Sequence, residues 1–508
     1  MSRRWISGAG FVLALILTCG PAAVAQQDAY AGLDAYISRV QRDWGVPGAA
    51  VVVVKNDAVV FKKVYGVRTL GKPAPVDENT LFVIGSATKA FTVASLGILV
   101  DEGKLKWDDH VSRLLPGFEL YDPYATREVT VRDIVSHRTG LPGENFLFWG
   151  SQLPRDEIIR RMRFLRPDSS IRSHFEYQNE MFITAGQIIP AVTGRSWDDF
   201  VRERIFGPLG MTSSLTSEPA SPQGMDLASP HSDITGTMQL IPEIKLYNAA
   251  PAGAIHSNID DMEKWLRLQM HNGSFNGKHV FSEAVGKEMH SPQTLIPLQA
   301  AASGLPAPDA NFFAYGLGWF LHDYHGHLLI DHGGATDGMT TMVGFAPNDN
   351  LGFVILTNAN QIPFLESVMF RIVDIGLERP EKDWNAYYRE QKKEYEDKEK
   401  AAEEKFQKER VAGTHPSLPL ASYAGKYTDE LYGPAEISIS GDRLVLRLTD
   451  LGFNADLEHW HYDTFRIQWR MTDHLADPSV KLLTFVLDAE GKPSQLRIQH
   501  VGEFHRVP

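Results

Sequence analysis

Ser86 and Lys89 are the residues of this chain whose types and spacing best suit catalysis. A strand-like run at residues 81–84 ends at Gly85, and an apolar helical pattern follows it. Residues three positions apart in a helix share one face, so the lysine amine can meet the serine hydroxyl. A serine hydroxyl becomes a useful nucleophile only when a neighbour takes its proton. The pair therefore predicts a nucleophile and its activator, with a helix N-cap at Ser86 as the alternative.

Two further motifs supply groups that acyl transfer needs. Tyr177 and Asn179 precede a helical pattern, and residues 331–335 follow the end of a strand pattern. Acyl transfer requires a base for the nucleophile, an acid for the leaving group and donors for the oxyanion. Lys89 or Tyr177 can be the base if the site lowers its pKa, because both side chains normally have pKa values of about 10.

The same motifs predict how a substrate is held. The Asn179 side chain can hydrogen-bond a substrate amide, and the backbone N–H of Ser86 is a candidate oxyanion donor. Gly333 and Gly334 carry no side chains, which lets a substrate approach the edge of the strand closely. Together these groups predict an acyl-transfer site.

The order Ser-x-x-Lys, Tyr-x-Asn and His-x-Gly resembles that of the serine β-lactamase and penicillin-binding protein superfamily. The class C β-lactamase-like branch, which includes carboxypeptidases, D-aminopeptidases and esterases, fits best over roughly residues 30–378. The resemblance implies that Ser86 is the nucleophile and Lys89 its activating partner. It also implies that Tyr177 is the general base and acid, and that Asn179 is a ligand of the substrate amide.

The third motif departs from the usual pattern of that family. The resemblance places His332 and Gly334 in this motif and assigns the second oxyanion N–H to Ala335. Penicillin-recognising members usually have Lys-Thr-Gly here, where the lysine and threonine help to bind a substrate carboxylate. A mostly neutral imidazole at pH 7 is a weaker carboxylate anchor. The change favours a peptidase, amidase or esterase over efficient β-lactam hydrolysis.

The order of strand and helix patterns predicts the architecture. Early and late strand patterns enclose a helix-rich middle, which predicts an α/β (α+β) domain over residues 28–378, with an antiparallel sheet flanked by helices and an all-helical region. Residues 379–415 are strongly charged and predict a solvated linker helix. Residues 416–508 contain short strand patterns and predict a small barrel or sandwich. Their resemblance to lipocalin-like domains appended to such hydrolases favours a C-terminal β-barrel.

Residues 1–25 have the organisation of a secretory signal peptide. Basic residues 3 and 4 precede an apolar run at residues 11–17, and small residues lead to a cleavage site after Ala25. The single cysteine, Cys19, lies inside this segment, so we expect no disulfide or thiol chemistry in the mature chain. Lipidation is disfavoured because the residue before Cys19 is not small. A periplasmic or secreted location without a further membrane span is expected.

The charge balance and the histidines limit the classes of partner. The chain has 50 Lys and Arg against 63 Asp and Glu, a net charge of −13, and no basic stretch, which argues against nucleic acid. No cofactor and no metal are expected. His322, His325 and His327 surround a predicted turn, and His459 and His461 flank Trp460, so exposed or structural roles are favoured over a metal site.

Other residues leave two interpretations open. His137 either lines the site or orders its loop. Phe146, Phe148 and Trp149 form either an apolar wall of the cleft or part of the core.

The function expected from the sequence is an exported serine hydrolase of amide or ester bonds. Its substrate would be a small molecule or a peptide, with cell-wall fragments among the candidates, and the oligomeric state stays open. One alternative is a β-lactamase or D-Ala-D-Ala carboxypeptidase. Another, from a different class, is a non-catalytic protein that binds cell-wall peptides or another ligand.

Overall fold

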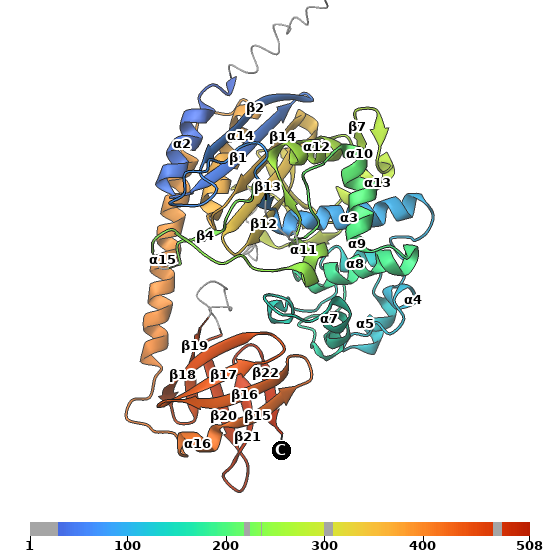
Figure 1. Ribbon diagram of the computed structural model, residues 1–508. Coiled ribbons are helices and arrows are strands. Elements are labelled where there is room, and N and C mark those ends of the chain that lie inside the picture. Colours follow the sequence, from blue (N-terminus) through green and yellow to red (C-terminus); the bar gives the residue numbers. More distant parts are fainter. Residues whose placement is uncertain (1–28, 218–223, 235, 299–307, 471–479, 508) are drawn as a thin grey trace, which may run out of the picture.

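The larger part of the molecule is a sheet covered by helices, and a long helix joins it to a smaller barrel (Figure 1). The computed structural model describes residues 29–217, 224–234, 236–298, 308–470 and 480–507, and the backbone alone of Asn145. The predicted signal peptide lies outside these residues. Within them, no helix combines the length and the apolar character needed to cross a membrane.

An eight-stranded antiparallel sheet organises the larger part, in the order β2-β1-β14-β13-β12-β11-β10-β9. Its strands are β1 (Gly48–Lys55), β2 (Ala58–Gly66), β9 (Thr294–Leu295), β10 (Phe313–Tyr315), β11 (Phe320–Tyr324), β12 (His327–Thr336), β13 (Met339–Ala346) and β14 (Leu351–Thr357). Strand β1 pairs with β14 from Ala49 opposite Thr357 to Lys55 opposite Leu351, so early and late segments share one sheet. This confirms the predicted antiparallel sheet.

Among the late strand patterns, the sequence of residues 315–321 predicts a single strand, and this prediction is wrong in extent. Strand β10 ends at Tyr315, and β11 begins only at Phe320. Between them Gly318 has a left-handed φ of +80°, a conformation that glycine adopts without steric cost. The chain therefore reverses direction here, and one predicted strand becomes a hairpin.

Both faces of the sheet are buried under helices. Ala49, Val51 and Val53 face a core cluster formed with α2 (Leu33–Asp43) and α14 (Ile362–Gly376). The alternate residues of β1 face the opposite cluster, to which α3 (Thr88–Asp101) and α12 (Ile259–Met270) contribute. Successive side chains of a strand point to opposite faces. A strand buried on both faces is therefore apolar throughout, as the sequence of β1 is.

Shorter elements complete this part. The remaining helices are α4 (Val111–Leu114), α5 (Pro123–Glu128), α6 (Val131–Ile134), α7 (Arg155–Arg161), α8 (Glu180–Thr193), α9 (Trp197–Val201), α10 (Gly207–Leu209), α11 (Ala250–Gly253) and α13 (Glu283–Met289). Two-stranded pairs are formed by β3 (Phe82–Val83) with β6 (His256–Ser257), β4 (His231–Ser232) with β5 (Gln239–Leu240), and β7 (Ser274–Phe275) with β8 (Lys278–His279).

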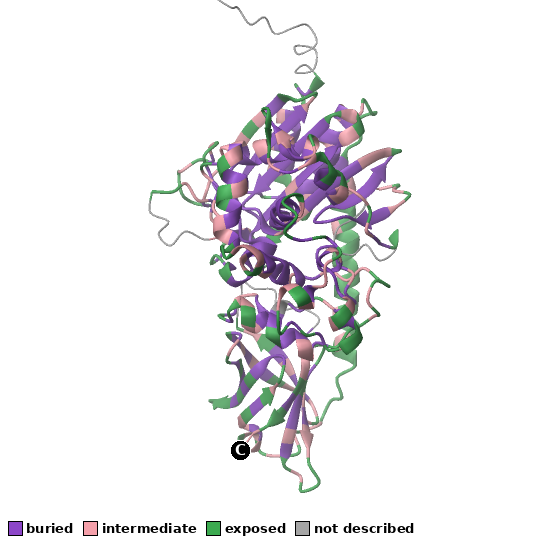
Figure 2. Cartoon of the chain, turned by 90° about the vertical axis from the view of Figure 1, so that its right-hand side faces the viewer, coloured by how far each residue is buried: buried purple, intermediate pink, exposed green. Residues whose placement is uncertain are grey.

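Helix α15 (Trp384–Lys408) connects the two parts and descends along the left edge of Figure 1. At its start Trp384 is buried and stacks on Phe370 of α14, with ring centroids 4.7 Å apart. Near its end Phe406 stacks on Trp460 of the barrel at 4.5 Å. Figure 2 shows the stretch between these contacts as an exposed helix. The charged helix is thus anchored at both ends and solvated between them.

The C-terminal part is a closed antiparallel barrel of eight strands, which confirms the predicted barrel over a sandwich. Its strands, after the short helix α16 (Leu420–Tyr423), are β15 (Gly425–Asp429), β16 (Gly433–Ser440), β17 (Arg443–Leu448), β18 (Phe453–His461), β19 (Thr464–Trp469), β20 (Leu482–Leu487), β21 (Pro493–Ile498) and β22 (Gly502–Arg506). The interior between these strands is packed with side chains, among them Tyr423 and Phe485, whose rings lie 4.7 Å apart.

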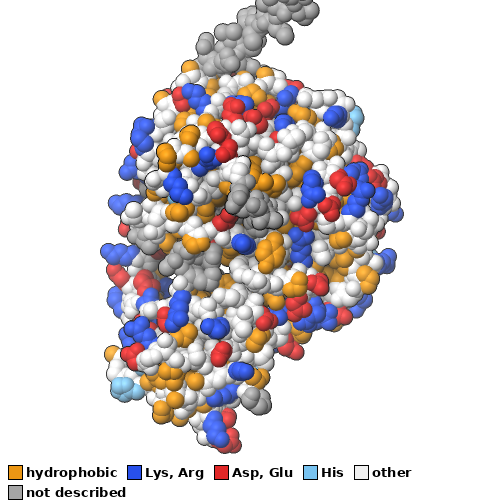
Figure 3. Space-filling model, in the orientation of Figure 1, with side chains coloured by type: hydrophobic (Ala, Val, Ile, Leu, Met, Phe, Trp, Pro, Cys, Tyr) orange, Lys and Arg blue, Asp and Glu red, His pale blue; other side chains and the backbone are white. Residues whose placement is uncertain are grey.

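The surface charge is mixed in sign. On the face shown in Figure 3, acidic and basic side chains are interspersed over both parts of the molecule. Many form local ion pairs, such as Arg160 with Glu157 on α7 at 2.6 Å. The excess of acidic residues is therefore spread over this face and not gathered in one patch.

We expect Phe91→Ala to destabilise the protein by about 3–5 kcal/mol, because it empties a packed position between α3 and α12. The Phe91 ring stacks on Trp265 at 3.6 Å, and both side chains are fully buried. Urea unfolding measures the loss, and Phe91→Leu, which keeps most of the volume, should cost less. An unchanged unfolding midpoint in Phe91→Ala would contradict this packing.

Candidate active site

Ser86 lies on a sharp turn between a short strand and a buried helix. The 3-10 turn Gly85–Ala87 follows β3 and leads directly into α3. Gly85 and Ala87 are buried, whereas Ser86 is partly exposed. Gly85 has a left-handed φ of +52°, and neither the turn nor α3 has a side-chain cap. The N-cap interpretation of Ser86 is therefore wrong, and its hydroxyl has another partner.

That partner is the fully buried amine of Lys89. The Lys89 Nζ lies 2.9 Å from Ser86 Oγ, 2.7 Å from Asn179 Oδ1 and 2.9 Å from the carbonyl oxygen of Ala252. Burial lowers the pKa of Lys89 well below its usual value, although the charge of Glu180 acts in the opposite direction. A neutral amine has two N–H donors and one lone pair. It can therefore donate to Asn179 and Ala252 while accepting the Ser86 proton.

Tyr177 is the second side chain that meets the nucleophile. Burial raises the pKa of Tyr177 above its usual value, and its hydrogen bond with Ser86 lowers that pKa by less. The phenol is thus protonated at neutral pH. The Lys89 Nζ also lies 4.9 Å from the centre of the Tyr177 ring. Of the two bases that the sequence offers, this environment favours Lys89 as the base and leaves Tyr177 as a proton donor.

The edge of β12 closes against the turn that carries Ser86. A Cβ atom added to Gly334 would lie 1.9 Å from the carbonyl oxygen of Ile84 and 3.0 Å from the Ser86 nitrogen. A Cβ atom added to Gly85 would lie 2.6 Å from the Ala335 nitrogen. The turn and β12 can approach this closely only because Gly85 and Gly334 have no side chains. It brings the backbone nitrogens of Ser86 and Ala335 together, as an oxyanion hole requires.

The same edge is open to a substrate. Among the described strands, β11 pairs with β12 only as far as Phe320 opposite Asp331, so its pairing ends before His332. Ala335 is exposed next to the partly exposed Ser86 turn. An extended substrate can therefore lie along β12 beyond this point.

His332 is buried and engaged on both ring nitrogens. Its Nδ1 lies 2.6 Å from the Gly333 carbonyl oxygen, which only an N–H can satisfy. The Nε2 atom, 2.9 Å from the Tyr315 hydroxyl, therefore accepts the phenolic hydrogen. Burial, assisted by the charge of Lys89, lowers the pKa of His332 to about 3. The third motif thus presents a neutral imidazole and no cation.

His137 orders the loop behind Tyr177. Its backbone has a left-handed φ of +55°, and its Nδ1 accepts the Gln178 N–H at 2.9 Å. The imidazole lies 4.3 Å from the Tyr177 ring and 4.6 Å from the Tyr315 ring, measured between centroids. Of the two interpretations left open by the sequence, loop ordering describes these contacts, and the ring supports Tyr177 from behind.

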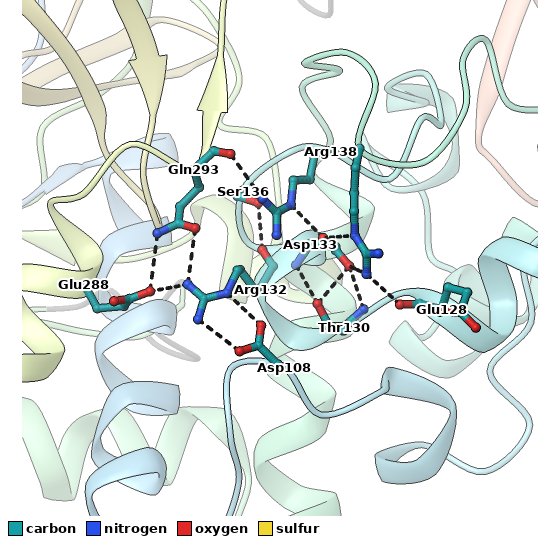
Figure 4. A network of polar contacts seen from close by, with 10 residues as sticks. Asp108, Glu128, Thr130, Arg132, Asp133, Ser136, Arg138, Glu288 and Gln293 are labelled. Carbon is teal, nitrogen blue, oxygen red and sulfur yellow. Dashed lines mark hydrogen bonds and ion pairs between the residues drawn. The ribbon is translucent and has the colours of Figure 1, made fainter.

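The loop that carries His137 is fixed by the buried carboxylate of Asp133 (Figure 4). Asp133 accepts hydrogen bonds from Thr130, from Arg138 at 2.6 Å and from Arg172 at 2.7 Å. Burial acts to raise the pKa of Asp133, but Arg172 and Thr130 outweigh it and hold the pKa below its usual value. Arg138 also donates to the carbonyl oxygen of Gln293, which connects this loop to the segment before β9.

The three aromatic residues after this loop have different surroundings. Phe148 is core, whereas Phe146 packs against Phe453 of the barrel with ring centroids 5.0 Å apart. Trp149 is partly exposed and donates to Asp337 at 3.4 Å. These residues therefore do not form one apolar wall.

The structure brings together Ser86, Lys89, Tyr177, Asn179, His332, Gly334 and Ala335, all from separated parts of the sequence. Two residues that the sequence analysis did not single out join them. Tyr315 was hidden in a strand pattern, and Glu180 at the start of α8 gave a signal in retrospect, as a carboxylate directly before an apolar helix. Of the histidine groups noted in the sequence, His322 bonds to Asp331 on β12, and His459 and His461 lie in β18 of the barrel.

We expect Gly334→Ala to lower kcat/KM by about 100-fold or more, because its methyl group would separate β12 from the Ser86 turn and widen the oxyanion hole. Gly333→Ala is the matched control, since its methyl group would meet nothing closer than Met342 at 3.5 Å. Steady-state kinetics with a p-nitrophenyl ester gives the comparison. Equal activity of the two variants would show that the close approach at Gly334 is not needed.

Comparisons with known proteins agree with this geometry. Residues 33–375 match the family described as Beta-lactamase, and residues 409–506 match a domain of unknown function, DUF3471. An unguisins hydrolase of Aspergillus campestris is 31% identical over 424 residues, covering 79% of this chain and 76% of that protein. Penicillin-binding protein 4 of Amycolatopsis lactamdurans is 28% identical, covering 64% and 84%.

A solved structure has the same fold. The octameric penicillin-binding protein homologue from Pyrococcus abyssi superposes with a TM-score of 0.61 at 20% identity, covering 93% of this chain and 98% of that one. The family match extends over most of the part that holds the site, and the fold match over both parts. The resemblance expected from the three motifs is thereby confirmed. This chain is a hydrolase of the β-lactamase family with a DUF3471 domain as its C-terminal barrel.

Proposed function

We propose that this protein cleaves amide or ester bonds through an acyl-enzyme on Ser86. The observation that carries the proposal is the buried Lys89 amine, 2.9 Å from Ser86 Oγ, whose pKa burial lowers well below its usual value. A neutral amine at this distance is a base aimed at the one proton whose loss activates the nucleophile.

The reaction follows from the positions of four residues. As Ser86 Oγ attacks the substrate carbonyl, its proton passes to Lys89 Nζ, and the N–H groups of Ser86 and Ala335 hold the oxyanion. The Tyr177 phenol gives its proton to the leaving group and regains one from the Lys89 ammonium. Water then attacks the acyl-enzyme by the reverse proton path and releases the acid. Asn179 orients Lys89 through the bond to its Oδ1.

The third motif supports a substrate that is not held by a carboxylate. His332 is neutral, and its Nε2 is occupied by Tyr315, so this position offers no charge to an anionic group. Peptide amides and esters therefore suit the site better than β-lactams. The name of the relative that hydrolyses unguisins supports hydrolysis, and the penicillin-binding relative keeps a β-lactamase or carboxypeptidase as the alternative.

The proposal includes export. Residues 1–25 carry the sequence pattern of a signal peptide, and a periplasmic or secreted enzyme fits a mature chain without cysteine. Cell-wall peptides would then be among the accessible substrates.

We expect Ser86→Ala to abolish both turnover and labelling by a serine-reactive phosphonate. Ser95→Ala is a matched control on α3, the helix that follows the Ser86 turn, because Ser95 is buried and its hydroxyl donates to the Phe91 carbonyl oxygen at 2.8 Å. Mass spectrometry of the labelled protein detects the phosphonate adduct. Labelling that persists in Ser86→Ala would contradict the acyl-enzyme mechanism. A folded wild-type protein that the phosphonate does not label would favour a non-catalytic binding protein.

A substrate panel separates the remaining candidates. We expect p-nitrophenyl esters or aminoacyl p-nitroanilides to be turned over at least about tenfold faster than nitrocefin, since nothing charged at His332 anchors the β-lactam carboxylate. D- and L-aminoacyl anilides in the same panel report stereochemical preference. Comparable rates for nitrocefin and the best ester or anilide would favour the β-lactamase alternative.

A further inference from the structure

Glu180 is a buried carboxyl group beside the site that the proposed mechanism does not use. It is the first residue of α8, directly after Asn179, and its side chain is fully buried. Its Oε1 accepts the backbone N–H of Glu144 at 3.1 Å. Among the described residues, Oε2 has no hydrogen-bond partner. A buried carboxyl group with so few partners is costly, so its retention calls for a function.

The residue that supports Glu180 is itself held by the C-terminal barrel. Glu144 is buried, and its Oε2 accepts a hydrogen bond of 2.6 Å from the hydroxyl of Tyr432. Tyr432 lies in the loop between β15 and β16. Burial, and then the charge of Glu144, raise the pKa of Tyr432 well above its usual value, so the phenol keeps the hydrogen that it donates. A continuous path thus leads from the barrel to α8.

The barrel is fixed at this point by two further contacts. Arg161 of α7 donates to Asp450 at 2.5 Å and to the carbonyl oxygen of Leu431 at 3.3 Å. Phe146, two residues after Glu144, packs between Phe453 and Trp469 of the barrel, at 5.0 and 5.9 Å. Tyr432 is therefore set in a packed interface, and its hydroxyl has a fixed position.

Glu180 directly follows Asn179, whose Oδ1 lies 2.7 Å from Lys89 Nζ, and its charge acts on Lys89 through space. The two side chains form no ion pair within 4.0 Å, since the Lys89 amine makes its hydrogen bonds to Ser86, Asn179 and Ala252. Burial raises the pKa of Glu180 to about 7, while the Glu144 N–H and the charge of Lys89 oppose this rise. With a pKa of about 7, the carboxyl group is partly ionised at neutral pH, and its carboxylate form favours the protonated form of Lys89.

We propose that the Glu180 carboxylate stabilises the ammonium that forms on Lys89 when Ser86 gives up its proton, and that the barrel keeps this carboxylate in place. Tyr432 fixes Glu144, and Glu144 fixes Glu180. The proton moves only from Ser86 Oγ to Lys89 Nζ, and Glu180 itself gains none. Glu180, Glu144 and Tyr432 are positioning residues, because they touch neither substrate nor reacting atoms. The inference rests on the proposed acyl-enzyme function.

The other titratable groups around Lys89 do not supply this charge. Burial lowers the pKa values of His137 and His332, and it raises that of Tyr177, so all three are neutral at pH 7. The rings of Tyr177 and Phe182 face the Lys89 amine at 4.9 and 5.3 Å and offer only weak attraction to a cation. The Glu144 carboxylate accepts the Tyr432 hydroxyl at 2.6 Å and is not among the charges that shift the pKa of Lys89.

The pH dependence of kcat/KM tests the inference. The full chain is assayed with a p-nitrophenyl ester, and active sites are counted by phosphonate titration. Glu180→Gln keeps an acceptor for the Glu144 N–H but removes the charge. We expect the plateau of kcat/KM to fall on the order of tenfold, because a less basic Lys89 is a weaker base. We also expect the acidic limb of the profile to move to lower pH, because a less basic Lys89 loses its proton more readily.

Tyr432→Phe tests the part played by the barrel. We expect the acidic limb to move in the same direction by a smaller amount, and the double variant to shift no further than Glu180→Gln alone. Tyr427→Phe is the matched control, since it removes a buried tyrosine hydroxyl that donates to Tyr423 within the barrel at 2.9 Å. Its pH profile should superpose on that of the wild type.

Each outcome decides between the alternatives. An unshifted limb in Glu180→Gln removes the carboxylate from the mechanism. If Tyr432→Phe lowers the melting temperature but leaves the acidic limb of the pH profile unshifted, the barrel has a purely structural role. The comparison of Tyr432→Phe with the wild type also decides the role of the barrel if Glu180→Gln does not fold. Loss of the inference is distinct from loss of the proposed function, because Ser86-dependent phosphonate labelling would then persist.

Discussion

The site depends on one interaction, the enclosure of a lysine amine in a dry interior next to a serine. Water would stabilise the ammonium form, and an ammonium group cannot take a proton from the Ser86 hydroxyl. The apolar character of α3 on all sides is therefore a chemical requirement as well as a packing feature. Asn179 at the start of α8 and Ala252 of α11 shield the amine from water and are two of its few partners.

The second constraint is steric, because the nucleophile and the oxyanion donors come from different layers. The turn at Gly85 belongs to the helical layer, and Gly334 belongs to the sheet. Their contact leaves no room for a methyl group on either residue. The rigid sheet therefore sets the position of Ala335, and the packing of α3 sets that of Ser86. A mobile loop would not hold two backbone N–H groups with this accuracy.

The sequence predicted the parts of the fold and site that depend on local patterns. Alternating and continuous apolar runs identified most strands of the sheet, and three short motifs identified the residues around Ser86. It did not predict β15 and β22, which are short and bury only one side chain each. The roles of Tyr315 and Glu180 depend on partners that are separated from them in the sequence. Tyr315 bonds to His332, and Glu180 bonds to Glu144. Such pairings are set by tertiary packing, which no local pattern encodes.

Helix α15 determines how the barrel meets the rest of the chain. A helix of 25 residues spans about 37 Å, and this one is anchored by Trp384 at one end and Phe406 at the other. A stiff tether of fixed length keeps the barrel at a high effective concentration next to its own α7. Docking of the barrel is then an intramolecular equilibrium. It does not weaken on dilution, as the association of a separate subunit would.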